Sequence, residues 1–239
     1  QALRVSGSRL RQAQEMARIG SFAWDEKTDE TIYQSPVIDD ILGISQADSP
    51  QTLEELLAFV HPDDRDRMRV VYGAIRGRGE PYDVEFTIVR PDGDVRHIHE
   101  LSTPEFDDAG DHVRSVGTFQ DVTDRKQAEQ ALRDSEERFR AILDNSPEAV
   151  SLKDGEGRYR LVNRQFETWY GCRREEVIGK TVHDVFSADV TEKFTARESE
   201  IATNGRISGR EVEMTFADGS RHLIAITEFP VLNSDGVTV

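Results

Sequence analysis

The chain is poor in cysteine and in basic residues, and it lacks long apolar runs. Its single cysteine, Cys172, excludes an intramolecular disulfide and a cysteine-rich zinc cage. No stretch approaches the roughly 18 apolar residues of a membrane-spanning helix. With 46 acidic and 30 basic side chains, the 239 residues carry a formal charge of −16, which repels a phosphate backbone. These deficits argue against nucleic-acid binding and favour a cytoplasmic location.

The sequence repeats itself. QALRVSGSRLR at positions 1–11 returns as QALRDSEERFR at 130–140, and VEFT at 84–87 returns as VEMT at 212–215, each followed by an Asp-Gly turn. A period this long is not that of a solenoid, whose units of roughly 20–50 residues must stack to bury a face. We therefore expect two domains, each with its own core. Because the chain opens on the end of a linker motif, we also expect the natural protein to continue upstream, where a membrane anchor remains possible.

Both copies show the same order of expected strands and helices. In the first copy, alternation and turn signals predict strands, and apolar residues at spacings of three and four, with proline and glycine at the ends, predict helices. The expected strands of the first copy are 20–25, 31–34, 82–90, 95–102 and 113–122, and its helices are 36–43, 52–59 and 62–76. The second copy predicts strands 149–153, 159–162, 209–216 and 221–230, helices 164–170 and 189–203, and a final strand at 237–239 on which the sequence stops.

The segment between the copies predicts one continuous helix. Residues 124–145 contain no glycine or proline and are rich in good helix formers, and Thr123 is a candidate cap for the first turn. Apolar and small side chains recur at spacings of three and four, namely Ala128, Leu132, Ser135, Phe139 and Ile142. This pattern fits an amphipathic helix that packs on its own domain, or a parallel dimer stalk. The sequence leaves both open.

The junction DVTDRKQAEQALRDSEERFRAILDNSPEAV at 121–150 resembles the junction between consecutive PAS domains of bacterial sensor proteins. GSFAWD at 20–25, HPDD at 61–64 and RPDGDVR at 90–96 resemble one PAS subclass, and residues 163–180 with ADGSR at 217–221 resemble the commoner pattern. The resemblance implies an α+β protein with two PAS folds. Each would be an antiparallel five-stranded sheet with helices on one face and a cavity between them.

The resemblance also sets the expected domain boundaries. Residues 1–18 form a helical lead-in, 19–122 the first PAS domain, 123–145 the linker helix, and 146–239 the second PAS domain, truncated at its last strand. Such regions lie upstream of a histidine kinase or a cyclic-dinucleotide enzyme.

Residues for catalysis or for a tightly held cofactor are hard to find. His97 and His99 share a strand face, but no cysteine or third histidine accompanies them, so we expect no catalytic or metal site. The sequence argues against haem, because a haem-binding PAS domain carries its histidine in the long helix, and neither expected helix has one. It also argues against a covalent flavin, because residues 171–173 lack the asparagine that precedes the cysteine of blue-light PAS domains. A flavin held without a covalent bond stays open, and the cofactor is unknown.

Inward-facing aromatic and small polar side chains are the candidate lining of a ligand pocket. In the first copy they are Trp24, Phe86 and Phe119, and in the second Asn163, Phe166, Trp169, Phe186 and Met214. Aromatic residues at these spacings more often fill a core than a binding site, so packing is the favoured interpretation for the first copy. The second copy is left open, and Asn163 is either a polar pocket residue or a helix cap.

The resemblance implies that Asp121 and Thr123 tie the end of the first domain to the linker helix and relay a signal. The main hypothesis is a non-catalytic sensory region that detects a small ligand or partner. It would act as a homodimer through its linker helices and control its own C-terminal output domain, most simply a histidine kinase. The alternatives are the input region of a diguanylate cyclase, and ligand-free modules that serve only dimerisation and protein interaction.

Overall fold

The computed structural model describes residues 17–188, 190–192, 194–196 and 207–231. The chain divides into two compact units, Gln1–Ala131 and Leu132–Val239, and the boundary falls inside one long helix. The expected lead-in helix lies almost wholly outside the described residues, as do the final strand and much of the expected helix 189–203. Among the described residues, no helix is both long and apolar enough to cross a membrane.

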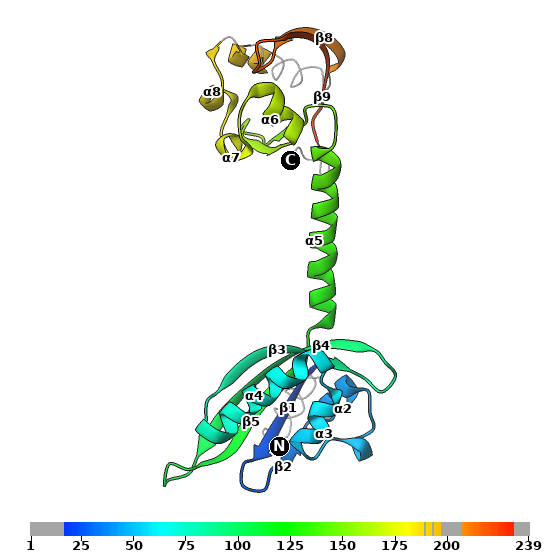
Figure 1. Cartoon of the computed structure of the whole chain (residues 1–239), viewed down its shortest axis with the longest axis vertical. Helices are drawn as coiled ribbons and strands as arrows, with labels where there is room; N and C mark the ends of the chain where they lie inside the picture. Colours follow the sequence, from blue (N-terminus) through cyan, green and yellow to red (C-terminus); the bar gives the residue numbers. More distant parts are fainter. Residues whose placement is uncertain (1–16, 189, 193, 197–206, 232–239) are drawn as a thin grey trace, which may run out of the picture. The chain divides into compact units, whose positions relative to one another are not determined.

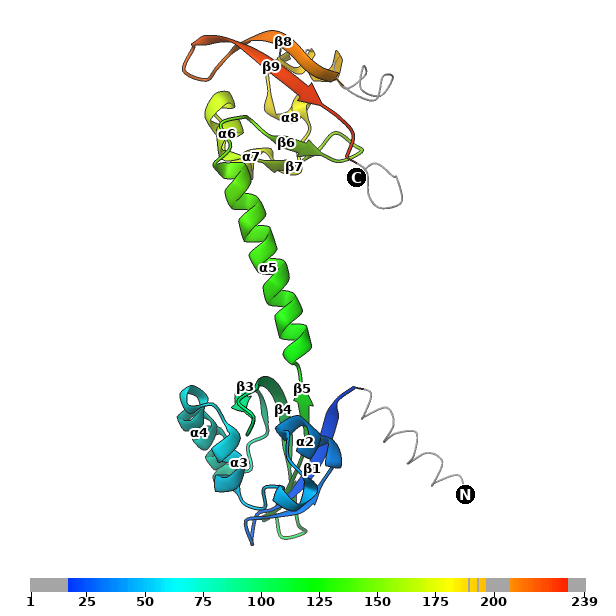
Figure 2. The same cartoon turned by 90° about the vertical axis from the view of Figure 1, so that its right-hand side faces the viewer.

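The first unit is an α+β fold built on one antiparallel sheet. Its strands are β1 (Ile19–Asp25), β2 (Glu30–Gln34), β3 (Tyr82–Val89), β4 (Val95–Phe106) and β5 (His112–Asp121). Its helices are α2 (Pro36–Leu42), the 3-10 helix η1 (Gln46–Asp48), α3 (Leu53–Phe59) and α4 (Pro62–Arg78). The sheet order is β2-β1-β5-β4-β3, and Figures 1 and 2 show α2, α3 and α4 on one face of it. This arrangement confirms the sheet expected for the first copy.

Local sequence signals set the ends of the helices. The Ser35 hydroxyl accepts from the amide of Val37 before α2, and Gly43 ends that helix in the left-handed conformation at φ 71°. Thr52 and Glu55 form a capping box that begins α3. His61 Nδ1 accepts from the amide of Asp63 at the start of α4. His61 is therefore the N-cap of α4.

Strand β4 runs four residues beyond its expected end at Ser102. Strand β3 pairs with β4 only as far as Ser102, whereas β5 continues to pair beyond it. Pro104 therefore lies where β4 has become an edge strand on its β3 side, and its missing N–H breaks no ladder bond there.

The core of the first unit lies between the helices and the inner face of the sheet. It combines helical residues such as Leu42, Leu57 and Met68 with Ile98 and Phe119 from the sheet, all 2% exposed or less. The sheet residues in the core alternate along their strands, since every second residue of β4 points inward. One charged side chain, Glu100, occupies an inward position of the same strand and is 2% exposed.

The long helix α5 (Thr123–Asp144) leads into the second unit. The strands there are β6 (Ser151–Lys153), β7 (Tyr159–Val162), β8 (Ile207–Thr215) and β9 (Arg221–Glu228). The helices are α6 (Arg164–Tyr170), α7 (Arg174–Val177) and α8 (Val182–Val185). The described strands pair as two hairpins, β6-β7 and β8-β9. The five-stranded sheet expected for this copy is thus not assembled among the described residues.

Candidate functional site

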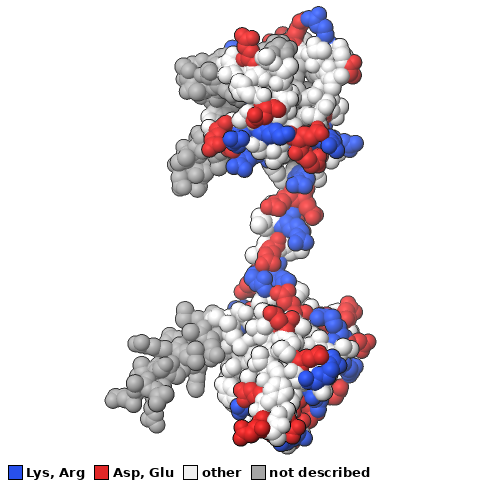
Figure 3. All heavy atoms as spheres, turned by 90° about the vertical axis from the view of Figure 1, so that its left-hand side faces the viewer, with Lys and Arg blue, Asp and Glu red and all other residues white. Residues whose placement is uncertain are grey.

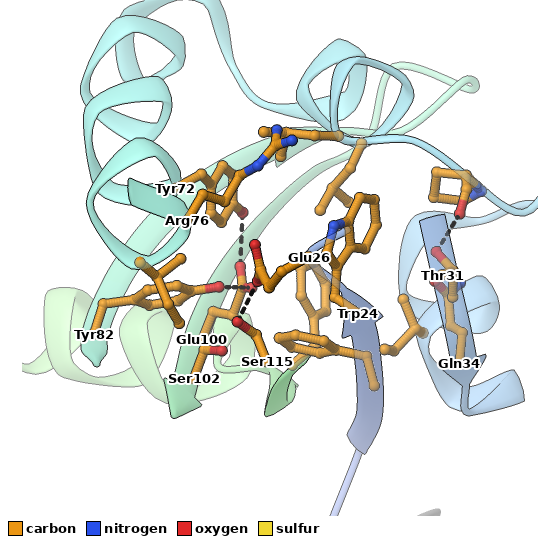
Figure 4. A pocket seen from close by; sticks show the side chains of 17 residues that line it. Trp24, Glu26, Thr31, Gln34, Tyr72, Arg76, Tyr82, Glu100, Ser102 and Ser115 are labelled. Carbon is orange, nitrogen blue, oxygen red and sulfur yellow. Dashed lines mark hydrogen bonds between the residues drawn. The ribbon is translucent and has the colours of Figure 1, made fainter. Parts of the chain in front are cut away.

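The first unit has a partly open cavity between its sheet and its helices. Its volume is about 60 Å³. One water-sized sphere takes about 10–15 Å³, so there is room for roughly four to six such spheres. Figure 4 shows the lining side chains converging from the sheet and α4. They are Phe22, Trp24, Glu26, Thr31, Gln34, Ile38, Pro50, Leu53, Leu56, Tyr72, Ile75, Arg76, Tyr82, Glu100, Ser102, Ser115 and Phe119.

Glu100 forms the most buried part of the polar wall. Its carboxyl oxygens accept hydrogen bonds from the hydroxyl of Tyr72 on α4 at 2.8 Å and from that of Tyr82 on β3 at 2.6 Å. Burial raises the pKa of Glu100 to about 7, an effect that the two tyrosine hydrogen bonds oppose. Burial and the nearby carboxyl also raise the pKa values of both tyrosines. The cavity thus contains a carboxyl group that changes its charge near neutral pH.

Glu26, just after β1, is the second carboxylate of the polar wall. Its side chain is 6% exposed, and its Oε1 accepts a short hydrogen bond from the Ser115 hydroxyl. His112 Nε2 lies 3.1 Å from the same hydroxyl oxygen. Glu26 Oε2 is buried and has no hydrogen-bond partner. An unpartnered buried carboxylate oxygen is costly, so Glu26 Oε2 is the acceptor in this wall that is available to a donor from outside the protein.

The cluster of Ser115, His112 and Glu26 is not a catalytic triad. In a triad the acid binds one imidazole nitrogen while the serine binds the other. Here Glu26 Oε1 lies 3.7 Å from His112 Nε2, the nitrogen that already contacts Ser115, and Nδ1 is buried without a partner. The serine cannot therefore transfer its proton through an oriented imidazole. The geometry supports binding and not acyl transfer.

Arg76 is the basic side chain of the lining. Its side chain is 35% exposed, and its guanidinium lies 3.0 Å from the carboxylate of Asp29. The Asp29 side chain is 42% exposed, so water reaches this ion pair. The positive charge of Arg76 is balanced at the edge of the site, and the carboxyl groups of Glu26 and Glu100 dominate the interior.

The predicted pocket residues of the first copy divide into two groups. Trp24 and Phe119 line the cavity. Phe86 is a core residue, 3% exposed, that packs edge-to-face on Phe119 with ring centroids 5.9 Å apart. The sequence favoured simple packing in this copy, whereas the structure leaves a cavity beside the packed core. The aromatic residues border it, but its hydrogen bonds come from side chains that the sequence analysis did not select.

The alternation of inward and outward residues along β4 indicates that Glu100 belongs to the cavity wall. Glu100 occupies the same phase of its strand as Ile98 and Ser102, which are both buried. A charged residue in an inward phase is informative because charged side chains are rarely buried without partners. The tyrosine partners are distant in sequence, and nothing in the sequence pairs them with Glu100.

In the second unit Asn163 is a structural hub. It is 1% exposed, and its side-chain oxygen accepts from the amides of Val150 and Phe166. Its side-chain nitrogen donates to the carbonyls of Leu143 and Glu148. All four bonds end on the backbone, so no hydrogen-bonding capacity remains for a ligand. The helix-cap interpretation is the one that the geometry fits.

The other predicted residues of the second copy do not meet in one pocket. Phe166 and Phe186 belong to an aromatic cluster around Tyr159. Trp169 stacks on Phe216 at 4.7 Å, and Met214 lies on β8 opposite His222. An open hollow in this unit is bordered by Phe186 together with α8 and the residues that follow it. The described residues hold no group of three or more histidine, cysteine, aspartate or glutamate side chains suited to a metal ion.

The exit from the first unit is tied to the sheet by side chains. Thr123 Oγ1 accepts from the amide of His97 on β4 at 2.9 Å, and Asp121 Oδ1 accepts from the amide of Thr123 at 2.9 Å. The hydroxyl was expected to cap the first turn of α5, but it binds the neighbouring strand. The Asp121 side chain, 2% exposed, lies 3.6 Å from the guanidinium of Arg96. A role of these residues in signal relay stays a prediction.

Two family models described as PAS fold match this chain, one over residues 31–119 and the other over 143–239. Sensor protein FixL of Bradyrhizobium diazoefficiens is 32% identical over 143 residues, which cover 60% of this chain and 28% of that protein. The probable diguanylate cyclase DgcE of Escherichia coli is 32% identical over 121 residues, covering 50% of this chain and 11% of that protein. The chain therefore spans less than a third of either relative.

Among solved structures, a sensory box histidine kinase/response regulator from Burkholderia thailandensis is 35% identical to the matched part. The match covers 56% of this chain and 98% of the Burkholderia chain, with a TM-score of 0.45.

Proposed function

This chain belongs to the PAS family, with two PAS domains in tandem, and we propose that it is the ligand-sensing input region of a bacterial signal-transduction protein. PAS sensory regions occur in signalling proteins such as histidine kinases and diguanylate cyclases, and proteins with these names match this chain. The observation that carries the proposal is the cavity of the first unit with the unpartnered, buried Glu26 Oε2. A packed interaction module has no need of such a group.

Native mass spectrometry of the gently purified chain tests ligand sensing. We expect one small molecule retained per protomer, or a mass shift when candidate ligands are added. Ser102→Leu fills the cavity and should abolish retention, whereas Thr103→Leu, on the exposed neighbour in the same strand, should not. Bare protein under all conditions, with both variants equally stable, would support the alternative of ligand-free interaction modules.

The relay proposal rests on the junction between β5 and α5. Ligand binding against β4 and β5 would shift the strand ends, and the bonds of Asp121 and Thr123 would pass that shift to the start of α5. Each such contact contributes roughly 1 kcal/mol, a size comparable to the energies that bias a two-state switch. Thr123→Pro in the full-length protein should uncouple stimulus from output, and unchanged signalling would refute the relay.

We propose that two copies associate through α5. Leu132, Phe139 and Ile142 are 62%, 56% and 71% exposed. Figure 3 shows acidic and basic side chains interspersed along the same helix. An apolar stripe framed by mixed charges is typical of a two-stranded coiled coil. Phe139→Glu should give monomers in light scattering, whereas Arg133→Glu on the same helix should leave the dimer intact. Dimers that persist in Phe139→Glu would contradict the stalk.

The output domain is proposed to be a histidine kinase, with a diguanylate cyclase as the alternative, since a sensory box histidine kinase/response regulator and a probable diguanylate cyclase both match this chain. Both enzymes use nucleotides, so the sensory region is proposed to lie on the cytoplasmic side. Incubating the full-length protein with ATP or with GTP separates the two: phosphorylation of the protein indicates a kinase, and a cyclic dinucleotide indicates a cyclase. We also propose that the two described hairpins of the second unit, β6-β7 and β8-β9, belong to one antiparallel sheet of a PAS fold.

A further inference from the structure

The chemistry of the cavity wall decides which ligand the first unit can hold. Five hydroxyl groups line the cavity, and each donates its hydrogen elsewhere. Tyr72 and Tyr82 donate to Glu100, and Ser115 donates to Glu26. Thr31 and Ser102 donate to backbone carbonyls. None of these hydroxyl hydrogens is directed at a ligand.

Two further polar side chains of the wall, Gln34 and Arg76, are paired within the protein. The amide nitrogen of Gln34 donates to Asp39 and to Ser49, which uses both of its hydrogens. Arg76 is paired with Asp29 at the edge of the site. Because Ser115 donates to Glu26, His112 Nε2 must carry the hydrogen that faces Ser115, so this imidazole also offers nothing to Glu26 Oε2. The wall therefore presents an acceptor that lacks a donor.

That acceptor belongs to an acidic side chain. The Glu26 side chain is 6% exposed and its Oε2 is unpartnered, while Glu100 contributes a second buried carboxyl group. Trp24, Phe22 and Phe119 form much of the remaining wall. A cation with N–H groups satisfies a buried carboxylate, and aromatic rings stabilise such a cation further. An anion would meet repulsion from the carboxylates.

The cavity volume limits the size of that cation. About 60 Å³ holds roughly four to six non-hydrogen atoms. The binding free energy that each non-hydrogen atom of a very small ligand can contribute is limited. For a ligand of this size we therefore expect no Kd below about 1 µM.

We propose that the cavity of the first PAS domain binds a small primary ammonium ion, whose N–H groups donate to Glu26 Oε2 and whose short carbon chain lies against Trp24. The inference rests on the proposed ligand-sensing function and narrows it to a chemical class. The ion would be an amine of two to four carbons, with or without a hydroxyl group. Figure 4 shows Glu26 between Trp24 and Glu100, where such an ion can meet the carboxylate and the ring together.

Titration calorimetry of the whole chain with ethylammonium, ethanol and acetate tests the class of ligand, because the three probes have similar size and different charge. We expect saturable binding of ethylammonium in the micromolar to millimolar range, and weaker binding of the other two. Glu26→Gln keeps an acceptor for Ser115 but removes the charge, so it should weaken ethylammonium binding about tenfold or more. Glu105→Gln, on a half-exposed acid of β4 outside the lining, should leave it within about twofold.

The outcomes separate this inference from the proposed function. Saturable binding of acetate or ethanol with none of ethylammonium overturns the ammonium class and leaves ligand sensing in place. Equal weakening by Glu26→Gln and Glu105→Gln also overturns it, because binding would then be a surface-charge effect. If no probe binds, the ammonium class fails, and the retained mass in the native spectrum decides ligand sensing separately.

Discussion

The two units share a sequence repeat but differ in how they treat a buried polar side chain. In the first unit Glu26 is buried with an oxygen that has no partner, beside a cavity. In the second unit Asn163 is buried with four hydrogen bonds, all to the backbone. Burial alone therefore does not mark a binding site. An unsatisfied group beside free volume is available to a ligand, whereas a fully satisfied one has no bonding capacity left and serves the fold.

The charge of the buried group sharpens this contrast. Asparagine is neutral and satisfied at every pH. Glu100 titrates inside the protein, because burial raises its pKa to about 7. The stability of the first unit should therefore depend on pH through one interior side chain, and the hub of the second unit should add no such dependence.

The largest effect is expected from Asn163→Ala. Four backbone groups lose their partner at once, which should lower the free energy of unfolding of the second unit by about 4 kcal/mol. Fluorescence-detected urea unfolding in a Trp24→Phe background isolates Trp169, which stacks on Phe216 in this unit. Asn145→Ala removes one exposed hydrogen bond on the neighbouring helix end and serves as the control. Equal losses in both variants would refute the hub.

The next effect is a pH dependence in the first unit. The folded-state pKa of Glu100, about 7, lies above the ordinary value of 4.5, so folding is favoured most when the carboxyl is protonated. As the pH rises from about 4.5 through 7, this contribution is lost, up to about 3 kcal/mol. Glu100→Gln should therefore match the wild type near pH 4.5 and exceed its stability by about 2–3 kcal/mol at pH 8. Trp24 fluorescence in a Trp169→Phe background reports it.

Glu105→Gln is the control for that measurement, because this half-exposed acid pairs with Arg114 on the surface. Its pH profile should follow the wild type. A Glu100→Gln profile with the same slope as the wild type would mean that another group titrates in this range.

A smaller effect is expected at the junction between β5 and α5. Thr123→Ala leaves the half-buried amide of His97 without its side-chain acceptor, which should cost about 1 kcal/mol in the first unit. Thr123→Ser retains the hydroxyl and should restore most of this loss. Urea unfolding followed through Trp24 measures both variants. If the serine variant is as unstable as the alanine variant, the methyl group and not the hydroxyl holds the junction.

The smallest effect concerns Cys172 in the second unit. Burial and the neighbouring Glu167 raise the pKa of its thiol, so less of the reactive thiolate is present at pH 8. A chromogenic disulfide reagent should react several times more slowly with the native protein than with the urea-unfolded chain. Reaction at equal rates in both states would contradict this environment.

Much of the fold followed from the sequence, because its signals are local. Strand β7 and helix α6 begin and end at the expected residues, and the helix 36–43 ends at its glycine. The internal repeat gave the two-unit organisation. The errors occurred where a distant partner decides the outcome. Pro104 is tolerated because β3 has already ended opposite it, and Thr123 binds β4 instead of its own helix.

The site was less predictable than the fold. Trp24 and Phe119 were selected because aromatic side chains at inward positions are visible in a strand pattern. The polar wall was not, since an acidic chain offers many carboxylates and no local pattern separates the buried ones from the solvated ones. Only the position of Glu100, at an inward-facing place in the alternation of β4, indicated a buried carboxyl group.

The sequence by itself determined that this chain is a tandem of two α+β modules joined by a helix, because periodicity, turn residues and repeats act over a few neighbouring positions. The tertiary structure decided which carboxyl groups are withdrawn from water and which of their oxygens find a donor. Those properties depend on side chains brought together from α4, β3, β4, β5 and the residue that follows β1. A hydrogen bond exists only where the fold places its two atoms within about 3 Å.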